Sequence, residues 1–145
     1  MQQFYQDLII GQQGEKTVGD YLTRQGATNL TYNNDKRYDI RYTTQERVEE
    51  TLEVKTDRLF SQTGNVAIEI QSRGKKSGII TSQATRWVYK LGEQMHIVDT
   101  ATLRANLRAS YEAAKVKLIT GGDDGTSLLL LVPVALFTAW CTQLV

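Results

Sequence analysis

Three charged side chains, Asp39, Glu53 and Lys55, are the residues of this 145-residue chain whose types and spacing are best suited to chemistry. Glu53 and Lys55 flank Val54 in a segment that alternates polar and apolar residues, as a β-strand does. Side chains two residues apart in a strand point to the same face, about 7 Å apart, and the residue between them points to the opposite face. We therefore expect Glu53 and Lys55 on one face of a sheet and Val54 in a core.

Asp39 lies in the preceding predicted strand, so that a hairpin would bring its carboxylate close to Glu53. Two carboxylates, a backbone carbonyl and waters are a typical ligand set for Mg²⁺ and leave positions open for a phosphate oxygen. Bound Mg²⁺ polarises a phosphodiester and lowers the pKa of a bound water, and a nearby lysine can stabilise the developing charge or orient that water. The three residues together therefore predict metal-dependent hydrolysis, whereas Glu53 and Lys55 alone would be read as a surface ion pair.

The elements that must position these residues follow from the apolar spacing. Residues 4–25 predict a helix that ends at Gly26 and carries Glu15, a further candidate carboxylate. We expect a polar loop over residues 27–37, then a meander of three strands over residues 38–43, 48–56 and 66–71. Further strands are predicted over 87–91, 95–98, 116–119 and 128–132, with helices over 100–114 and after Pro133. The order predicts one α/β domain spanning residues 1–145, with a mixed central sheet flanked by helices.

A basic segment between residues 72 and 90 contains no acidic residue. Because the formal net charge of the chain is only +1, any binding of nucleic acid must come from such a local patch. The candidate DNA-contacting residues are Arg73, Lys75, Lys76 and Arg86. Trp87 and Tyr89, which alternate with apolar residues, are interpreted as core residues rather than as a base-stacking surface.

The ordered set Glu15, Asp39 and Glu53-Val54-Lys55, on a helix followed by strands, resembles the PD-(D/E)XK nuclease superfamily over roughly residues 8–100. It looks most similar to small Holliday-junction resolvases and phage-encoded endonucleases, although Tyr38 stands where a proline often precedes the aspartate. The resemblance implies a restriction-endonuclease-like core. It also implies Mg²⁺, with Mn²⁺ as a substitute, held by Asp39, Glu53 and the carbonyl of Val54, with Lys55 as the catalytic lysine and Glu15 assisting.

The first functional hypothesis is a metal-dependent DNA endonuclease that is selective for branched DNA or is a phage-type nuclease. One alternative is a site-specific restriction-type or homing-type endonuclease, and another is a non-catalytic nuclease-like module that binds nucleic acid or protein. Cutting two strands symmetrically requires two sites, so we expect a homodimer, with the apolar C-terminal helix as a candidate interface.

The apolar stretch over residues 128–141 is shorter than the ~20 residues that a membrane-spanning helix needs, and Pro133 interrupts it. We interpret it as a buried strand running into a helix, with a tail anchor as the alternative. The single cysteine, Cys141, excludes an internal disulfide and fits a reducing compartment. The first residues lack the pattern of a signal peptide, and we expect a cytoplasmic protein without membrane partners, in the host cytoplasm if it is phage-encoded.

Overall fold

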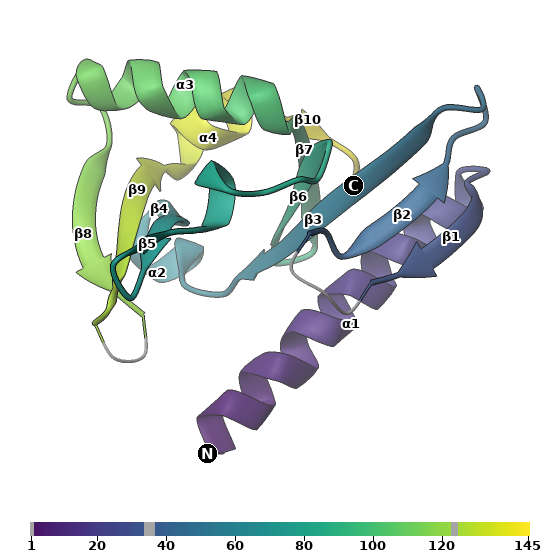
Figure 1. Cartoon of the computed structure of the whole chain (residues 1–145), viewed down its shortest axis with the longest axis horizontal. Coiled ribbons are helices and arrows are strands. Elements are labelled where there is room, and N and C mark those ends of the chain that lie inside the picture. Colours follow the sequence, from purple (N-terminus) through teal and green to yellow (C-terminus); the bar gives the residue numbers. More distant parts are fainter. Residues whose placement is uncertain (1, 34–36, 123–124) are drawn as a thin grey trace.

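The computed structural model describes residues 2–33, 37–122 and 125–145, which form two β-sheets and the helices that cover them (Figure 1). In chain order the elements are α1 (Gln2–Arg24), β1 (Thr28–Tyr32), β2 (Ile40–Thr43), β3 (Glu49–Asp57), α2 (Phe60–Thr63), β4 (Asn65–Ser72), β5 (Lys75–Lys76), the 3-10 helix η1 (Gly78–Ile80), β6 (Arg86–Leu91), β7 (Gln94–Asp99), α3 (Thr100–Glu112), β8 (Lys117–Gly121), β9 (Ser127–Pro133), α4 (Val134–Trp140) and β10 (Thr142–Gln143).

The larger sheet has six strands in the order β1-β2-β3-β6-β7-β10. Its neighbours are antiparallel except at the centre, where β3 pairs with β6 in parallel, with Glu53 opposite Trp87 and Lys55 opposite Tyr89. Residues opposite each other share a face. Glu53, Lys55, Trp87 and Tyr89 therefore lie on one face of this mixed sheet, and Val54 and Val88 lie on the other.

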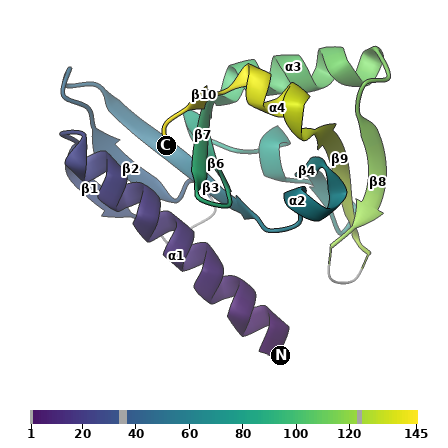
Figure 2. The same ribbon diagram turned by 180° about the vertical axis from the view of Figure 1, so that it is seen from behind.

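Helix α1 lies across the face that carries Val54 (Figure 2). Val18 and Leu22 of α1 pack there against the apolar side chains of β2, β3, β6 and β7. Gly26, with φ +93°, ends the helical region in a left-handed conformation, as glycine permits. The predicted helix over residues 4–25 is thus confirmed, and its buried half is the part that anchors Glu15.

The smaller sheet has the order β5-β4-β9-β8, and β4 and β5 lie between β3 and β6 in the chain. Its apolar side chains and those of α3 and α4 form a second core with Trp87, Tyr89 and Leu91 of β6. Trp87 is 1% and Tyr89 2% exposed, so their interpretation as core residues is confirmed. The second core therefore packs on the face of β6 opposite α1, beside the face of β3 that carries Glu53 and Lys55.

Two parts of the predicted meander are wrong. The segment over residues 27–37 is expected to be a loop, but Thr28–Tyr32 forms β1 and supplies the first strand of the meander. The segment over residues 66–71 is expected as its third strand, but it belongs to β4 of the smaller sheet. The strand beside β3 is instead β6, which arrives in parallel. The helix and the three-stranded meander remain, but the meander consists of β1, β2 and β3.

The apolar stretch over residues 128–141 forms most of β9 and all of α4, as its interpretation as a strand followed by a helix predicts. Phe137 of α4 is fully buried, and Leu136 and Trp140 pack against the same core. The apolar side of α4, which is the candidate dimer interface, is therefore already occupied within the chain. Across the described ranges, no helix combines the length and apolar character needed to cross a membrane.

Candidate active site at the open edge of β3

The candidate site lies where β3 extends beyond its neighbour β2. The pairing between these strands ends at Ile40 opposite Leu52, so that Glu53 and the residues after it have no β2 partner. The backbone N–H of Val54 instead donates a 2.8 Å hydrogen bond to Oδ2 of Asp39. In a strand, the N–H and C=O of one residue point toward the same neighbouring strand. The carbonyl of Val54 therefore points to the same edge as Asp39.

Asp39 directly precedes β2, and its backbone is held on both sides. Its N–H donates to the carbonyl of Leu52 at 2.8 Å, and its own carbonyl accepts from the N–H of Asn33 at 2.8 Å. These bonds fix the backbone of Asp39 between β3 and the chain that follows β1. Its carboxylate is thus directed at the edge of β3 by the sheet itself.

Glu53 and Lys55 lie on the same face of β3, and Val54 points into the core with 8% exposure. The side chain of Glu53 is 19% exposed, and its Oε1 lies 3.9 Å from Nζ of Lys55. Nζ of Lys55 also lies 5.7 Å from the ring centroid of the buried Trp87. The side chain of Lys55 is 47% exposed, so that the ammonium is held beside Glu53 and still reaches solvent.

Glu15 reaches the site from α1 because Gly14 allows the helix to pack closely on β3. A Cβ at Gly14 would collide with Oγ1 of Thr56 in β3. Glu15 is half-buried next to this contact and interacts electrostatically with both Asp39 and Lys55. The close approach at Gly14 therefore brings the third carboxylate to Asp39 and Glu53.

The crowding of these carboxylates affects their proton affinities. Burial raises the pKa of Glu53 to about 8, and its hydrogen bond with Asp39 and the charges of Asp39 and Glu15 add to this, whereas Lys55 opposes it. Burial likewise raises the pKa of Glu15 to about 7, with the charge and hydrogen bond of Asp39 as the next causes. Carboxylates held together in this way cannot all ionise at low cost unless a cation shares the site.

The donor set fits a hard divalent cation, because it consists of carboxylate oxygens and one backbone carbonyl at the edge of β3 beyond the end of its pairing with β2. Within the described ranges, no three His, Cys, Asp or Glu side chains are already arranged around one common metal position. A cation here would therefore be held by Asp39, Glu53 and the carbonyl of Val54, with water completing its shell, and Glu15 would lie beside it.

The four candidate DNA-contacting residues do not stay together. Arg73, Lys75 and Lys76 are exposed on the hairpin between β4 and β5, which belongs to the smaller sheet. Arg86 begins β6, and its guanidinium lies 3.0 Å from Oδ1 of Asp99 and 3.6 Å from Oε2 of Glu50. The structure thus leaves three exposed cations on one hairpin and places Arg86 in an ion-paired cluster.

Sequence reasoning overlooked a cavity at the end of β3, where the strand extends one residue beyond the predicted range, to Asp57. A cavity of about 290 Å³ lies there, lined by Lys55, Thr56, Asp57, Arg58, Leu59, Ala67 and Tyr89. Asp57 holds its wall in place by accepting hydrogen bonds from the N–H groups of Leu59 and Ala67. Arg58 forms an ion pair with Asp7 of α1. Asp57 continues the alternation of side chains that contains Glu53 and Lys55, and this is the signal in the sequence that could have indicated the wall of the cavity.

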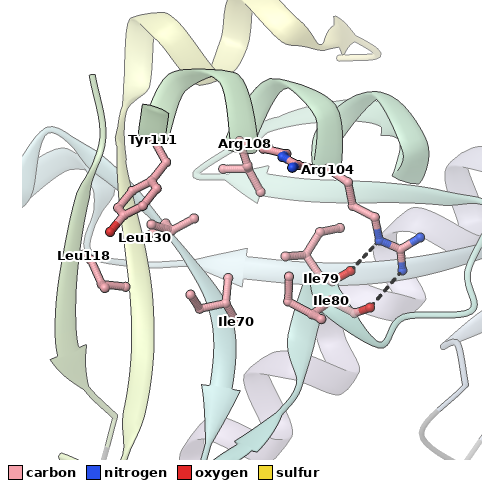
Figure 3. Close-up of a pocket in the computed structure, with 9 residues that line it drawn as sticks. Ile70, Ile79, Ile80, Arg104, Arg108, Tyr111, Leu118 and Leu130 are labelled. Atoms are coloured by element: carbon pink, nitrogen blue, oxygen red, sulfur yellow. Dashed lines mark hydrogen bonds between the residues drawn. The ribbon is translucent and has the colours of Figure 1, made fainter. Parts of the chain in front are cut away.

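A larger cavity, of about 480 Å³, lies away from these carboxylates, between α3, η1 and the smaller sheet (Figure 3). Its walls are mainly isoleucine and leucine side chains. Arg104 reaches from α3 toward η1, but its guanidinium donates to the carbonyls of Ile79, Ile80 and Ser82 and thereby fixes η1. Among the described residues that line this cavity there is no carboxylate, which is the group that metal-dependent hydrolysis requires.

Comparisons with protein-family models, with curated proteins and with solved structures find no match to this chain. The assignment of a function therefore depends on the residues and geometry of the site alone.

Proposed function

We propose that this chain is a divalent-metal-dependent endonuclease that hydrolyses DNA phosphodiester bonds at the open edge of β3. The observation that carries the proposal is the convergence of Glu15, Asp39 and Glu53 with Lys55 at one place. The four residues come from a helix, a loop and a strand that are separated in the sequence, and a surface ion pair between Glu53 and Lys55 requires neither of the other two.

A restriction-endonuclease-like core is part of the proposal. It is supported by the order of the elements, since a helix, an antiparallel meander of three strands and a parallel strand beside the third follow one another along the chain. The insertion of β4, β5 and η1 before that parallel strand is an elaboration of this arrangement.

Each residue has a distinct role in the proposed reaction. Asp39, Glu53 and the Val54 carbonyl would hold Mg²⁺, or Mn²⁺ in its place, and the ion would polarise the phosphate and lower the pKa of a water. Lys55, half-exposed beside Glu53, orients the attacking water and stabilises negative charge that develops on the phosphate. Glu15 lies beside Asp39 at the edge of the site and positions the water there.

DNA is the proposed substrate, with branched DNA as the first choice. Three exposed cations, Arg73, Lys75 and Lys76, offer contacts to backbone phosphates on the β4–β5 hairpin. Such contacts carry no base specificity. A structure-selective enzyme is therefore favoured over a site-specific one.

The deciding experiment offers linear duplex, flapped and four-way DNA, and an RNA duplex, to the purified chain with Mg²⁺ or with EDTA. We expect cleavage that requires the metal and prefers the branched substrates. Asp39→Asn and Lys55→Ala should each lower the rate by about 10²-fold or more, because each removes a group that acts on the reacting atoms.

The matched control is Lys16→Ala. Lys16 is also an exposed lysine paired with a carboxylate, Asp20 at 3.1 Å, but it lies outside the site. Its removal should leave cleavage unchanged. Equal cleavage by the native chain and by the Asp39→Asn and Lys55→Ala variants would identify a contaminant and refute the proposal, and cutting of linear duplex at one sequence would favour a restriction-type enzyme.

A further inference from the structure

Helix α1 carries one continuous row of residues of which only half is covered by the sheet. The row alternates steps of four and three residues, the spacing of a helix that packs along a single side: Phe4, Leu8, Gly11, Glu15, Val18 and Leu22. Val18 is fully buried and Leu22 is 8% exposed, whereas Phe4 is 60% and Leu8 48% exposed. Figure 2 shows the N-terminal half of α1 extending past the edge of the sheet.

The uncovered part forms an apolar patch comparable to the largest patch of a typical monomeric protein. Tyr5 and Ile9 flank the row and are 54% and 52% exposed. Together with Phe4 and Leu8, they leave on the order of 400 Å² of apolar side-chain surface in contact with water. The largest apolar patch on a protein surface is often functional.

The helix also needs support along this half. The buried residues of α1 are Gly14, Val18, Gly19 and Leu22, so the turns before Gly14 have little packing of their own. A helical segment of ~12 residues is marginal in water, and each interior glycine costs about 1 kcal/mol relative to alanine. A partner surface that packs on the exposed row would therefore stabilise this half of the helix.

The charges of this half favour a protein surface of the same kind over DNA. Between residues 2 and 14 the sequence contains one charged residue, Asp7, and Arg58 of the same chain forms an ion pair with it. The segment offers no lysine or arginine for a phosphate, and the ion pair with Arg58 balances the charge of Asp7 that would otherwise repel a second copy. The apolar side of α4 is already packed in the core, so it does not compete for this role.

We propose that the N-terminal half of α1 is the interface of a homodimer, in which the α1 helices of two copies pair in antiparallel fashion about a two-fold axis near Leu8. A Cβ added at Gly11 would meet nothing within 4 Å, so the surface there is open to close approach. The antiparallel pairing sets Phe4 of one copy over Gly11 of its partner, and it repeats this contact on the other side of the axis, as an isologous interface does.

The interface is small, which is typical of weak and transient association. Two copies together bury on the order of 800 Å² of apolar surface, which lies at the low end for specific protein interfaces. The dimer is therefore in equilibrium with monomer at micromolar concentrations. Glu15 lies further along the same row as Leu8, so each copy brings its own candidate site to the pair, although dimerisation itself does not depend on nuclease activity.

Sedimentation equilibrium of the full chain between about 1 and 200 μM tests this directly. We expect a monomer–dimer equilibrium, and the double variant Phe4→Gln/Leu8→Gln should weaken it by about tenfold or more while glutamine preserves the helix. The matched control is Leu118→Gln/Ile119→Gln on the edge strand β8, where the two residues are 44% and 37% exposed. It should leave the equilibrium unchanged.

A cross-link identifies the partner surface independently. Leu8→Cys in a Cys141→Ser background should form a covalent dimer under mild oxidation, and Ile119→Cys in the same background should not. A chain that is monomeric at every concentration overturns the proposal. Weaker binding of single-stranded DNA by the Phe4→Gln/Leu8→Gln variant would not rescue it. A dimer that resists this variant but dissociates with the β8 variant overturns it in favour of the sheet edge. Either result leaves the nuclease test unaffected.

Discussion

Oδ2 of Asp39 accepts a 2.8 Å hydrogen bond from the backbone N–H of Val54, at the point where β2 no longer accompanies β3. One carboxylate oxygen thus replaces a missing strand partner and lies beside a carbonyl directed to the same edge. The bond gives Asp39 a structural role in addition to the proposed catalytic one. The two roles can be separated by the choice of substitution.

Asp39→Asn should preserve the fold and lower the cleavage rate by about 10²-fold or more, because an amide oxygen still accepts from Val54 but the negative charge is lost. Asp39→Ala removes the acceptor as well, and it should lower the free energy of unfolding by about 1.5–3 kcal/mol relative to the native chain. Urea denaturation of both variants measures this difference. Equal stability of the two variants would mean that the hydrogen bond contributes nothing to the fold.

The stability of the metal-free chain should fall as the pH rises from about 7 to 8.5. Glu53 ionises near its ordinary pKa of 4.5 when unfolded and near 8 when folded, so its stabilising contribution is complete below pH 4.5 and is lost as the pH passes 8. Glu15 behaves in the same way up to about 7. Burial lowers the pKa of His96 below 6.5, so its opposite effect is over before this range begins.

Thermal melting in EDTA measures this dependence. The midpoint should drop between pH 7 and 8.5 for the native chain, and Glu53→Gln should flatten the slope, whereas Glu112→Gln on the exposed surface of α3 should not. Mg²⁺ should raise the midpoint at pH 8.5 in the native chain and much less in Glu53→Gln, since the cation relieves the same repulsion. A native midpoint that stays level or rises over this range contradicts the described crowding.

Gly14→Ala should displace α1 from β3 and move Glu15 out of the site. The new Cβ collides with Thr56 Oγ1, and overpacking of this kind costs about 1–3 kcal/mol. Gly11→Ala is the matched control, because nothing lies within 4 Å of its added Cβ and alanine favours the helix by up to about 1 kcal/mol. Chemical denaturation at a low, monomeric concentration compares them. A Gly14→Ala chain as stable as the native one would show that the helix yields easily there.

Replacing the hairpin cations should weaken DNA binding without affecting the fold. The triple variant Arg73→Gln/Lys75→Gln/Lys76→Gln removes exposed charges, and the slope of log affinity against log salt should become shallower by about 0.9 for each phosphate that these side chains neutralise. Fluorescence anisotropy at several salt concentrations gives the slope. An unchanged slope would exclude the hairpin from the DNA interface.

Arg86→Gln should have the opposite effect: it should lower stability and leave DNA binding unchanged. It leaves Glu50, whose side chain is 20% exposed and hydrogen-bonded to Tyr42, without the nearby cation, so the melting temperature should fall while the salt slope is kept. If the slope becomes shallower instead and the melting temperature stays, Arg86 contacts DNA, as its place in the basic segment predicts.

Local sequence patterns were sufficient to predict which face a side chain occupies, because this depends on one strand alone. The alternation around Val54 correctly placed its side chain in the core and those of Glu53 and Lys55 on the opposite face. Trp87 and Tyr89 were correctly placed in the core by the same rule. The β1 strand escaped detection because its burial pattern shows no clear alternation, with a single half-buried residue, Leu30, at its centre.

The sequence by itself determined the helix that carries Glu15, the alternating strand that carries Glu53 and Lys55, and the apolar strand and helix near the C-terminus. Only the tertiary structure decided that β6 rather than β4 lies beside β3. Both segments are apolar strands, and the residue types do not indicate which strand a backbone hydrogen bond joins. The tertiary structure also decided that the N-terminal half of α1 extends beyond the edge of the sheet. An apolar row on a helix indicates that the row packs against another surface. Only the length of the neighbouring strands shows how many residues of the row the sheet covers.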